Sequence, residues 1–264
     1  MAIVAERETV SVEPRGNPVL RHLIIPLINF LYPPRCAACG AALDEGESRR
    51  LCAACVARME PLPAGRCAIC GGARDSATGA AERCGKCLAR RPHYRAAFAV
   101  ARYRASAEDE RGSLPALIRR HKYGLDQAAG RALAEFLPPV LPVSAADYDT
   151  IVPVPLHWRR LWWRGFNQAA LLGDEIARRT GLPLDAVSFA RRRFTSPQTA
   201  RDHDERVRNV RRAFAVTRPD RIKGRRILLV DDVMTTGATA NECARVLMAA
   251  GAAQVDVFTL ARAL

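Results

Sequence analysis

Two adjacent carboxylates followed by a run of small, hydroxyl-bearing residues form the pattern in this sequence with the clearest chemistry. Asp231 and Asp232 come directly after the apolar run 227–230, and the string Thr-Thr-Gly-Ala-Thr at 235–239 opens a helix that we expect to reach about Ala250. A short continuous apolar run is typical of a parallel strand buried on both faces. Open parallel sheets bind ligands beyond the carboxyl ends of their strands, which is where both carboxylates are predicted to lie.

The string at 235–239 has the composition of a phosphate-binding turn. Small residues let backbone N–H groups approach an anion at a helix N-terminus, and threonine hydroxyls supply further donors. Carboxylates before such a turn can accept hydrogen bonds from ribose hydroxyls, so the whole pattern favours a sugar-phosphate site. An ordinary strand and helix joined by a well-capped turn would use some of the same residue types, but it would not require the full string. The predicted phosphate-binding residues are Thr235, Thr236, Gly237, Ala238 and Thr239.

The cysteines predict a second site. Eight of the nine cysteines fall into four pairs separated by two residues, the spacing at which one tight turn directs two thiolates at one metal ion. Two such pairs complete a closed tetrahedral site, so the sequence predicts two structural Zn²⁺ ions. Disulfides would need an oxidising compartment, for which the chain shows no export signal, and redox Cys-x-x-Cys motifs normally occur singly. The predicted zinc ligands are Cys36, Cys39, Cys52, Cys55, Cys67, Cys70, Cys84 and Cys87.

The way in which the four pairs share two metal ions is open from spacing alone. We favour the sequential arrangement, with the first two pairs on one ion and the last two on the other, and a cross-brace is the alternative. The segment has little apolar core of its own, so metal binding should supply its folding free energy. Cys243 stands alone on the helix after the phosphate turn and is predicted to be a buried core residue.

Composition and charge limit the classes of protein to which the chain can belong. A chain of 264 residues, of which 49% are hydrophobic, can hold one medium domain and a smaller module. The formal net charge of +14 favours polyanions such as nucleic acid or phosphorylated substrates, although arginine-rich codon usage would produce the same charge. No segment approaches the length of a membrane span and no signal peptide is recognisable, so we expect a cytoplasmic protein.

Four regions are expected along the chain. Residues 1–18 are polar and aperiodic and are predicted to be a disordered tail. Residues 19–35 are predicted to form an amphipathic helix, and residues 36–90 a double zinc ribbon. After an Arg-Arg-Pro boundary, residues 91–264 are predicted to form a separate α/β domain.

Several elements are expected within that last region. Residues 97–103 are predicted to form a strand, and residues 114–122 and 127–141 two helices. The segment 151–155, Ile-Val-Pro-Val-Pro, is predicted to be a strand that ends in a proline-stiffened loop. The highly charged residues 191–214 form a long connection, and connections of this length are usually functional or mobile. We expect a solvated lid or helix there.

All three tryptophans of the chain lie together with arginines between two of these elements. Residues 157–168 contain this cluster in a predicted loop, and the helix that follows is expected to reach Thr180. Arginines in such a loop suit the clamping of pyrophosphate, and tryptophans suit stacking on nucleic-acid bases. Burial of the tryptophans in a core or an interface is the alternative.

The strand, the carboxylate pair and the phosphate turn together resemble the PRPP (5-phosphoribosyl 1-diphosphate) motif of type I phosphoribosyltransferases. The resemblance implies a parallel sheet with helices on both faces, and it implies that Asp231 and Asp232 bind the ribose 2′ and 3′ hydroxyls. It also implies Mg²⁺ bound with PRPP, and a loop at Val154 and Pro155 that presents backbone N–H groups to pyrophosphate. If a reaction is catalysed, the two carboxylates would hold the ribose while pyrophosphate leaves C1.

The order of the motifs narrows the resemblance to the ComF family of bacteria. The cysteine pairs, Val-Pro-Val-Pro, Arg-Gly-Phe-Asn-Gln, Thr-x-x-Gln, Arg-x-x-Asn and the PRPP motif follow one another between about residues 30 and 262. The resemblance implies a PRPP-binding protein of natural competence that takes part in uptake or processing of transforming single-stranded DNA, alongside a helicase-like partner. A phosphoribosyltransferase with an unknown acceptor and a non-catalytic PRPP-sensing regulator are the alternatives. The residues of the Arg-Gly-Phe-Asn-Gln string expected in the binding site are Arg164, Gly165, Asn167 and Gln168.

Overall fold

The computed structural model describes most of the chain beyond residue 32. The described ranges are 33–43, 50–74, 82–104, 111–123, 130, 132–134, 136–138, 141–194 and 208–264. The predicted tail at 1–18 lies outside them, and of the helix predicted at 19–35 only residues 33–35 are described, which are not helical. Within the described ranges, no helix is long and apolar enough to cross a membrane.

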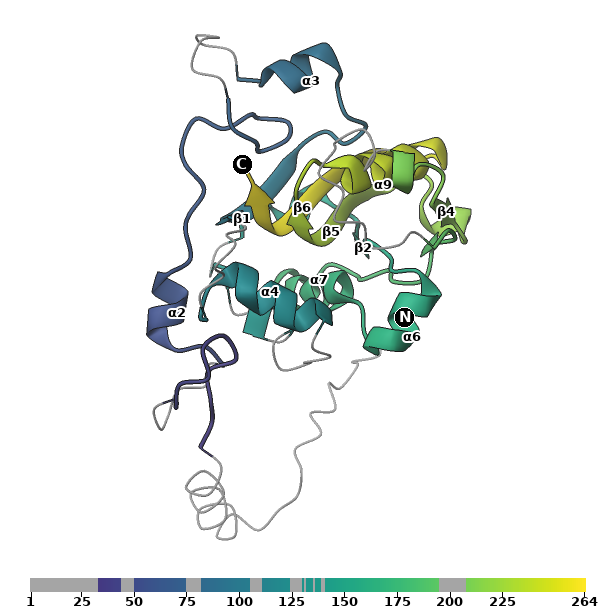
Figure 1. Cartoon of the computed structure of the whole chain (residues 1–264). Coiled ribbons are helices and arrows are strands. Elements are labelled where there is room, and N and C mark those ends of the chain that lie inside the picture. The colour runs from purple at the N-terminus through teal and green to yellow at the C-terminus, as the bar shows by residue number, and fades with distance from the viewer. Residues whose placement is uncertain are drawn as a thin grey trace, which may run out of the picture.

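A parallel sheet forms the centre of the described structure (Figure 1). Its strands, in spatial order, are β1 (Ala97–Tyr103), β6 (Gln254–Ala263), β5 (Arg226–Met234) and β2 (Thr150–Pro153). Every neighbouring pair runs parallel, as the apolar run in β5 predicts for a strand buried on both faces. The prediction of an α/β fold built on a parallel sheet is confirmed.

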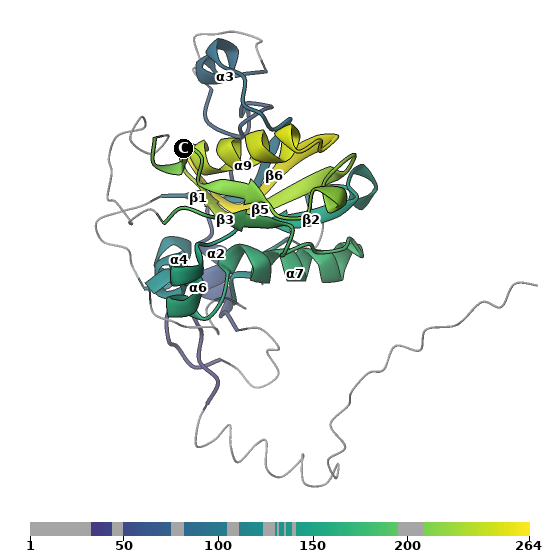
Figure 2. The same ribbon diagram turned by 90° about the vertical axis from the view of Figure 1, so that its right-hand side faces the viewer.

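Side chains of β5 alternate between two hydrophobic cores, because successive residues of a strand point to opposite faces. The helices that cover the sheet are α4 (Leu114–Tyr123), α7 (Gln168–Thr180) and α9 (Ala238–Ala249). Ile227 and Leu229 lie in one core with residues of α9, whereas Leu228 and Val230 lie in the other core with residues of α4 and α7. Figure 2 shows α9 over one face of the sheet and α4 and α7 under the other. Further short helices in the described ranges are α2 (Ala53–Ala57), α3 (Gly85–Ala89), η2 (Ala145–Asp147) and η3 (Pro219–Arg221).

The first elements of the sheet domain agree closely with the sequence-based expectation. β1 occupies the residues predicted for it, and α4 ends one residue beyond the predicted end at 122. The helix predicted at 127–141 is present, since residues 132–134 are helical. It ends before residue 136, because residues 136–138 are not helical. The predicted C-terminal boundary at 141 was therefore too late.

The segment that carries the tryptophans is a helix, and not the loop that was expected. α6 (Trp158–Arg164) ends at Gly165, whose φ of 77° is a left-handed conformation that glycine adopts without strain. Asn167 then caps α7, because its Oδ1 accepts a hydrogen bond from the Ala169 N–H at 3.1 Å. The helix expected to reach Thr180 is therefore present as α7, and the predicted loop before it contains a separate helix that ends at Gly165.

The charged connection at 191–214 begins and ends in a small antiparallel sheet that the sequence did not reveal. β3 (Phe189–Arg191) pairs with β4 (Phe214–Val216), and the rings of Phe189 and Phe214 stack with their centroids 5.6 Å apart. Residues 195–207, in the middle of the connection, lie outside the described ranges. The expected lid therefore stays a prediction.

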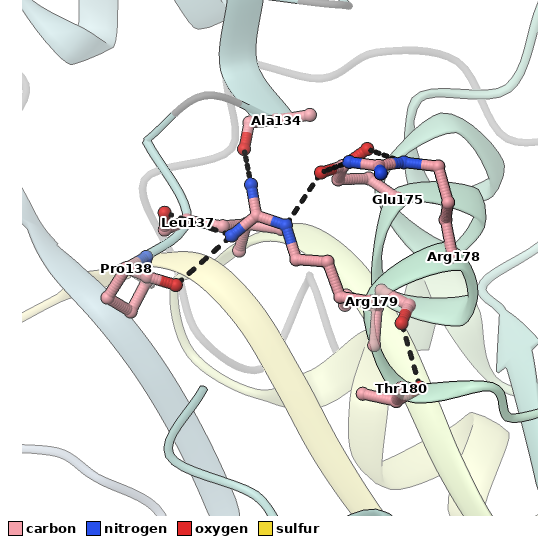
Figure 3. Close-up of polar contacts among 8 residues, drawn as sticks. Ala134, Leu137, Pro138, Glu175, Arg178, Arg179 and Thr180 are labelled. Atoms are coloured by element: carbon pink, nitrogen blue, oxygen red, sulfur yellow. Dashed lines mark hydrogen bonds and ion pairs between the residues drawn. The ribbon is translucent and has the colours of Figure 1, made fainter. Parts of the chain in front are cut away.

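Arg179 of α7 binds backbone carbonyls in the segment of the chain that precedes β2 (Figure 3). Its guanidinium donates to the carbonyl oxygens of Leu137 and Pro138 at 3.3 and 3.1 Å. Its Nε donates to Glu175 Oε1 at 2.6 Å. A guanidinium offers five donors in a fixed plane, so one side chain can satisfy several carbonyls at the end of a helical segment.

Candidate functional site

The eight paired cysteines form two separate clusters of four thiols. The first cluster consists of Cys36, Cys39, Cys52 and Cys55, and the second cluster consists of Cys67, Cys70, Cys84 and Cys87. Within each cluster the sulfur atoms all lie within 4.8 Å of one another. The pairs are thus grouped in the order of the sequence, as we preferred, and not as a cross-brace.

The positions of the thiols fit a tetrahedral zinc ion. Sulfurs bound to Zn²⁺ at about 2.3 Å lie roughly 3.8 Å apart, and the sulfur separations are 3.8 Å for Cys39 and Cys52 and 3.7 Å for Cys70 and Cys84. Burial raises the pKa of the Cys36 thiol, but backbone N–H donors outweigh burial and lower that pKa to about 6, whereas burial and the neighbouring thiols raise the pKa of Cys55. The close grouping of four sulfur atoms is therefore the observation that indicates structural Zn²⁺, which binds cysteines as thiolates.

Cys243, the ninth cysteine, lies on α9 and is fully buried. Burial raises the pKa of its thiol well above the usual value, which keeps the thiol protonated and unreactive. The prediction of a core residue is confirmed.

The predicted carboxylates lie together in the last four residues of β5. Asp232 is buried and Asp231 is half-buried. One oxygen of each carboxylate accepts a local backbone hydrogen bond, Asp231 Oδ1 from the Asp232 N–H at 2.9 Å and Asp232 Oδ1 from the Val233 N–H at 2.7 Å. These bonds hold both side chains in defined rotations at the carboxyl end of the sheet, immediately before the phosphate turn.

The phosphate turn, residues 235–239, joins β5 to α9. Thr235 is exposed, and Gly237 forms the N-cap of α9 with a φ of 81°. Thr236 Oγ1 accepts a hydrogen bond from the Ala238 N–H at 3.3 Å. Because glycine has no side chain with which to cap the helix, the other N–H groups in the first turn of α9, beginning at Thr239, are placed to bind an anion.

The loop after β2 shares the carboxyl edge of the sheet with the carboxylates, because β2 pairs directly with β5. Val154 uses both of its backbone groups within the fold. Its N–H donates to the Val230 carbonyl at 2.8 Å, and its carbonyl accepts from Asn167 Nδ2 at 3.1 Å. Pro155 has no N–H. Val154 and Pro155 therefore shape this loop, and any backbone donor that the loop offers to a ligand comes after Pro155.

The Arg-Gly-Phe-Asn-Gln string forms the junction between α6 and α7. Arg164 is buried at the end of α6, Gly165 ends that helix, and Asn167 begins the next one. Gln168 is 5% exposed, and its buried Nε2 has no hydrogen-bond partner in the part of the chain that the structure describes. Within this string, Asn167 thus fixes the fold, whereas the Gln168 amide retains hydrogen-bonding capacity.

Arg191 is a cation near this edge that the sequence did not single out. It ends β3 and forms an isolated parallel bridge with His157, and its Cζ lies 5.4 Å from the centroid of the Phe214 ring. Burial and the charge of Arg160 lower the pKa of Arg191, and the Asp231 carboxylate acts in the opposite direction. The Asp231 carboxylate is therefore one of the charges that act on Arg191. A three-residue strand leaves too short a pattern to be recognised in sequence.

The tryptophans lie on the surface of α6. Trp158, Trp162 and Trp163 are 67%, 85% and 53% exposed, so the alternative of a buried core is excluded. The Cζ of Arg159 lies 5.8 Å from the Trp158 ring and 5.4 Å from the Phe194 ring. The surface of α6 thus combines exposed aromatic rings with guanidinium groups.

Known protein families match both parts of the chain. A double zinc ribbon domain corresponds to residues 27–88, and a phosphoribosyl transferase domain corresponds to residues 167–264. The fold and the two kinds of site therefore define a phosphoribosyltransferase-type protein with a zinc-ribbon module.

Individual relatives show to which family within this class of protein the chain belongs. Competence protein F of Haemophilus influenzae is 30% identical over 245 residues, which are 90% of this chain and 100% of that protein. The DNA utilization protein YhgH of Escherichia coli is 36% identical over 188 residues, 69% of this chain and 78% of that protein. A solved glutamine PRPP amidotransferase from B. subtilis, complexed with ADP and GMP, is 20% identical with a TM-score of 0.33 and covers 59% of this chain and 29% of that chain. The chain belongs to the ComF family, as the order of its motifs indicated.

Proposed function

We propose that this protein binds PRPP together with Mg²⁺ and acts in natural competence, in the uptake or processing of transforming single-stranded DNA. The observation that carries the PRPP proposal is the position of Asp231 and Asp232 beside the glycine turn at the start of α9. The role in competence is supported by membership of the ComF family, whose relatives are named for competence and DNA utilization.

Each part of the site would bind a different group of PRPP. The N–H groups at the start of α9 suit the 5′-phosphate, because the helix N-terminus carries partial positive charge. Asp231 and Asp232 would accept hydrogen bonds from the ribose 2′ and 3′ hydroxyls. Their local backbone bonds fix the carboxylates beforehand, which reduces the entropy lost on binding. Mg²⁺, when bound, would neutralise pyrophosphate charge and would be held largely by the ligand's own oxygens.

Two further activities are compatible with the same site. A phosphoribosyl transfer to an unidentified acceptor would use the fixed carboxylates to hold the ribose where positive charge develops at C1. A PRPP-sensing regulator would need only the binding step. Pyrophosphate release on addition of an acceptor such as single-stranded DNA would favour transfer, whereas PRPP binding without release would favour sensing.

Direct contact with single-stranded DNA is a second candidate function, and the surface of α6 supports it. Exposed tryptophans beside arginines can stack on bases and pair with phosphates without sequence preference. The tryptophans are clustered on one short helix, so several bases could be bound by neighbouring rings.

The test is calorimetric titration of the zinc-loaded protein with PRPP, with and without Mg²⁺. We expect PRPP to bind more tightly with Mg²⁺ than without it, and more tightly than ribose 5-phosphate, which lacks the pyrophosphate. Absence of saturable PRPP binding at low ionic strength would refute the PRPP part of the proposal. Titration with a single-stranded oligonucleotide tests the DNA part independently.

We also propose that the protein works in the cytoplasm beside a helicase-like partner. Eight of its cysteines form two clusters suited to zinc, and cysteines that bind metal must stay reduced, as they do in the cytoplasm. Crosslinking in competent cells, followed by identification of the bound proteins, tests the partner. Recovery of no helicase would refute that part.

A further inference from the structure

We propose that the second zinc cluster sets the conformation of the phosphate turn, and that Arg262 is the positioning residue that joins the two. Zinc at the second cluster, and not at the first, then controls the affinity of the turn for a 5′-phosphate. The identity of that ligand rests on the proposed function, whereas the link between cluster and turn rests on contacts within the fold.

Arg262 is a buried cation whose partners are backbone carbonyls. It lies near the end of β6, opposite Met234 in the register of β5, and is 7% exposed. Its Nη1 donates to the Met234 carbonyl at 3.0 Å and also to the carbonyl of Thr235, the first residue of the phosphate turn. Its Nε donates to the Cys70 carbonyl at 3.1 Å. One guanidinium therefore joins a zinc-ligand residue of the second cluster to the start of the turn.

The guanidinium has no carboxylate to compensate its burial in the part of the chain that the structure describes. Burying a charge is costly unless each of its donors is satisfied, so the fold must keep the carbonyl oxygens around Arg262 in place. Gly72 permits the close approach of the cysteine turn, since a Cβ there would lie 3.2 Å from Arg262 Nη2 and 3.3 Å from Cys70 Sγ. A disturbance of the cysteine turn would therefore be transmitted to Arg262.

A second set of contacts, through Tyr94, Met234 and His93, also joins the second cluster to the phosphate turn and the start of α9. Tyr94 is buried in one core with Met234 and with cysteines of the second cluster. A Cβ at Gly237 would lie 2.7 Å from Met234 Cε and 3.4 Å from Tyr94 Oη, so these side chains pack directly under the turn. The His93 N–H donates to Asn241 Oδ1 on α9 at 2.7 Å. The phosphate turn thus rests on residues that border the second cluster.

The first cluster has no such connection among the described residues and provides the internal control. Its cysteines Cys36 and Cys55 lie in the opposite core, with residues of α4. The polar contacts of the first cluster also reach α4 and the residues just before it. The Gly112 N–H donates to the Ala38 carbonyl at 3.2 Å, and Arg120 Nη1 donates to the Ala37 carbonyl at 2.8 Å. In Figure 1, α2 of the first cluster and α3 of the second lie on opposite sides of the sheet.

Loss of zinc from the second cluster has a definite consequence in this arrangement. Metal binding supplies the folding free energy of a cysteine turn, so the Cys70 carbonyl loses its fixed position when zinc leaves. Arg262 must then find another partner, because an unsatisfied buried donor is costly. The turn becomes more mobile as a result. A ligand that needs the ordered turn then has a lower apparent affinity, because only the fraction of molecules with an ordered turn can bind it.

Paired substitutions compare the two clusters directly. Cys84→Ser with Cys87→Ser removes two ligands from the second cluster, and Cys52→Ser with Cys55→Ser removes two from the first. Each variant should keep about one Zn²⁺ per chain, which metal analysis measures. Hydrogen exchange in peptides covering 234–241 should become about tenfold faster in the second-cluster variant, and its affinity for PRPP with Mg²⁺ should fall about tenfold. The first-cluster variant should match the wild type in both measurements.

Arg262→Lys tests the link while both clusters stay intact. Lysine keeps the positive charge but lacks the planar fork, so it cannot bind the Cys70 carbonyl and the turn together. We expect full zinc content, faster exchange at 234–241 and weaker PRPP binding. Arg102→Lys is the matched control, because Arg102 is the register partner of Arg262 on β1 and lies half-buried beside Glu60.

The outcomes separate this inference from the proposed function. Unchanged exchange at 234–241 in both Arg262→Lys and the second-cluster variant would overturn the link, and so would an equal effect in the first-cluster variant. If the wild type does not bind PRPP, the proposed function fails, and the exchange measurement still decides whether the second cluster orders the turn.

Discussion

Asn167 Nδ2 donates a hydrogen bond to the Val154 carbonyl at 3.1 Å and so ties the start of α7 to the loop after β2. The Oδ1 of the same amide accepts the Ala169 N–H at 3.1 Å. One side chain thus satisfies a helix N–H that has no partner within the helix and a carbonyl of the neighbouring loop. Asn167 was expected at the ligand, and its visible contacts fix the loop that borders the ligand site.

Substitution of Asn167 should therefore act on stability. Asn167→Ala removes the helix cap and the bond to Val154, and we expect the free energy of unfolding to fall by about 1–2 kcal/mol. Urea denaturation of zinc-loaded protein, followed by circular dichroism, measures the change. Asn167→Asp retains the capping oxygen but not the Nδ2 donor, so it should recover only part of the stability. An alanine variant as stable as the wild type would contradict this role.

Zinc content should report the two clusters separately. Protein prepared under reducing conditions should contain about two Zn²⁺ per chain, and Cys36→Ser should lose one while keeping the other, because the clusters share no ligand. Cys243→Ala should keep both, since Cys243 belongs to neither cluster. Elemental analysis by mass spectrometry decides the matter, and a folded protein that contains no zinc would refute the assignment.

Removal of the carboxylate pair should weaken PRPP binding strongly. Asp231→Asn with Asp232→Asn should cost several kcal/mol in Mg²⁺–PRPP affinity, because hydrogen bonds to charged acceptors contribute about 1.5–3 kcal/mol each. Calorimetry measures the affinity. The control pair is Asp174→Asn with Asp220→Asn, which removes two exposed carboxylates outside the site. If both double variants bind PRPP as the wild type does, the ligand site lies elsewhere.

The parts of the site that could be predicted from sequence are those encoded within a few neighbouring residues. The apolar run of β5 identified a strand buried on both faces, and the string after it placed the carboxylates and the turn at the end of that strand. The cysteine spacing identified the metal ligands for the same reason, since each pair lies within one turn. Sequential grouping of the pairs needed the structure, because spacing allows more than one arrangement.

The contacts that join distant segments could not be predicted. Arg262 binds the carbonyl of Cys70, 192 residues earlier in the chain, and no local pattern marks either residue for that role. Arg191 lies in a strand too short to show alternation, and its position near Asp231 depends on the β3–β4 pairing. The helix α6 was missed because its seven residues make only about two turns, too short for a helical pattern to stand out in a run of arginines and tryptophans.

A buried acid behind the phosphate turn predicts a pH dependence of stability. Glu242 of α9 pairs with Arg245 at 2.8 Å and accepts the Arg212 N–H at 2.8 Å. The Arg245 guanidinium lowers the pKa of the Glu242 carboxyl, burial opposes this, and the Arg212 N–H adds to the lowering. Because the folded pKa lies below the unfolded value of about 4.3, the stabilisation is present above that pH and is lost as the pH falls through the folded pKa.

Glu242→Gln keeps the shape of the side chain and removes its charge. The variant should be less stable than the wild type at pH 7, and the difference should shrink as the pH falls below about 4. The difference between the two proteins is the quantity to follow, because acid also releases zinc from both. Urea denaturation at several pH values measures it. A difference that stays constant from neutral to acidic pH would show that the carboxylate charge contributes nothing.

The exposed tryptophans of α6 predict how single-stranded DNA binds. Trp162 is 85% exposed, so Trp162→Ala should leave the thermal stability nearly unchanged. If the ring stacks on a base, the same change should weaken binding of a single-stranded oligonucleotide by about 1–3 kcal/mol and leave the salt dependence of the affinity intact.

Arg159→Ala should instead lower the slope of log affinity against log salt by about 0.7 for each DNA phosphate that the arginine had neutralised. Met248→Ala, an exposed apolar change on α9, is the control. Fluorescence titration across a salt series measures both quantities, and equal DNA affinity of Trp162→Ala and wild type would remove α6 from the DNA site.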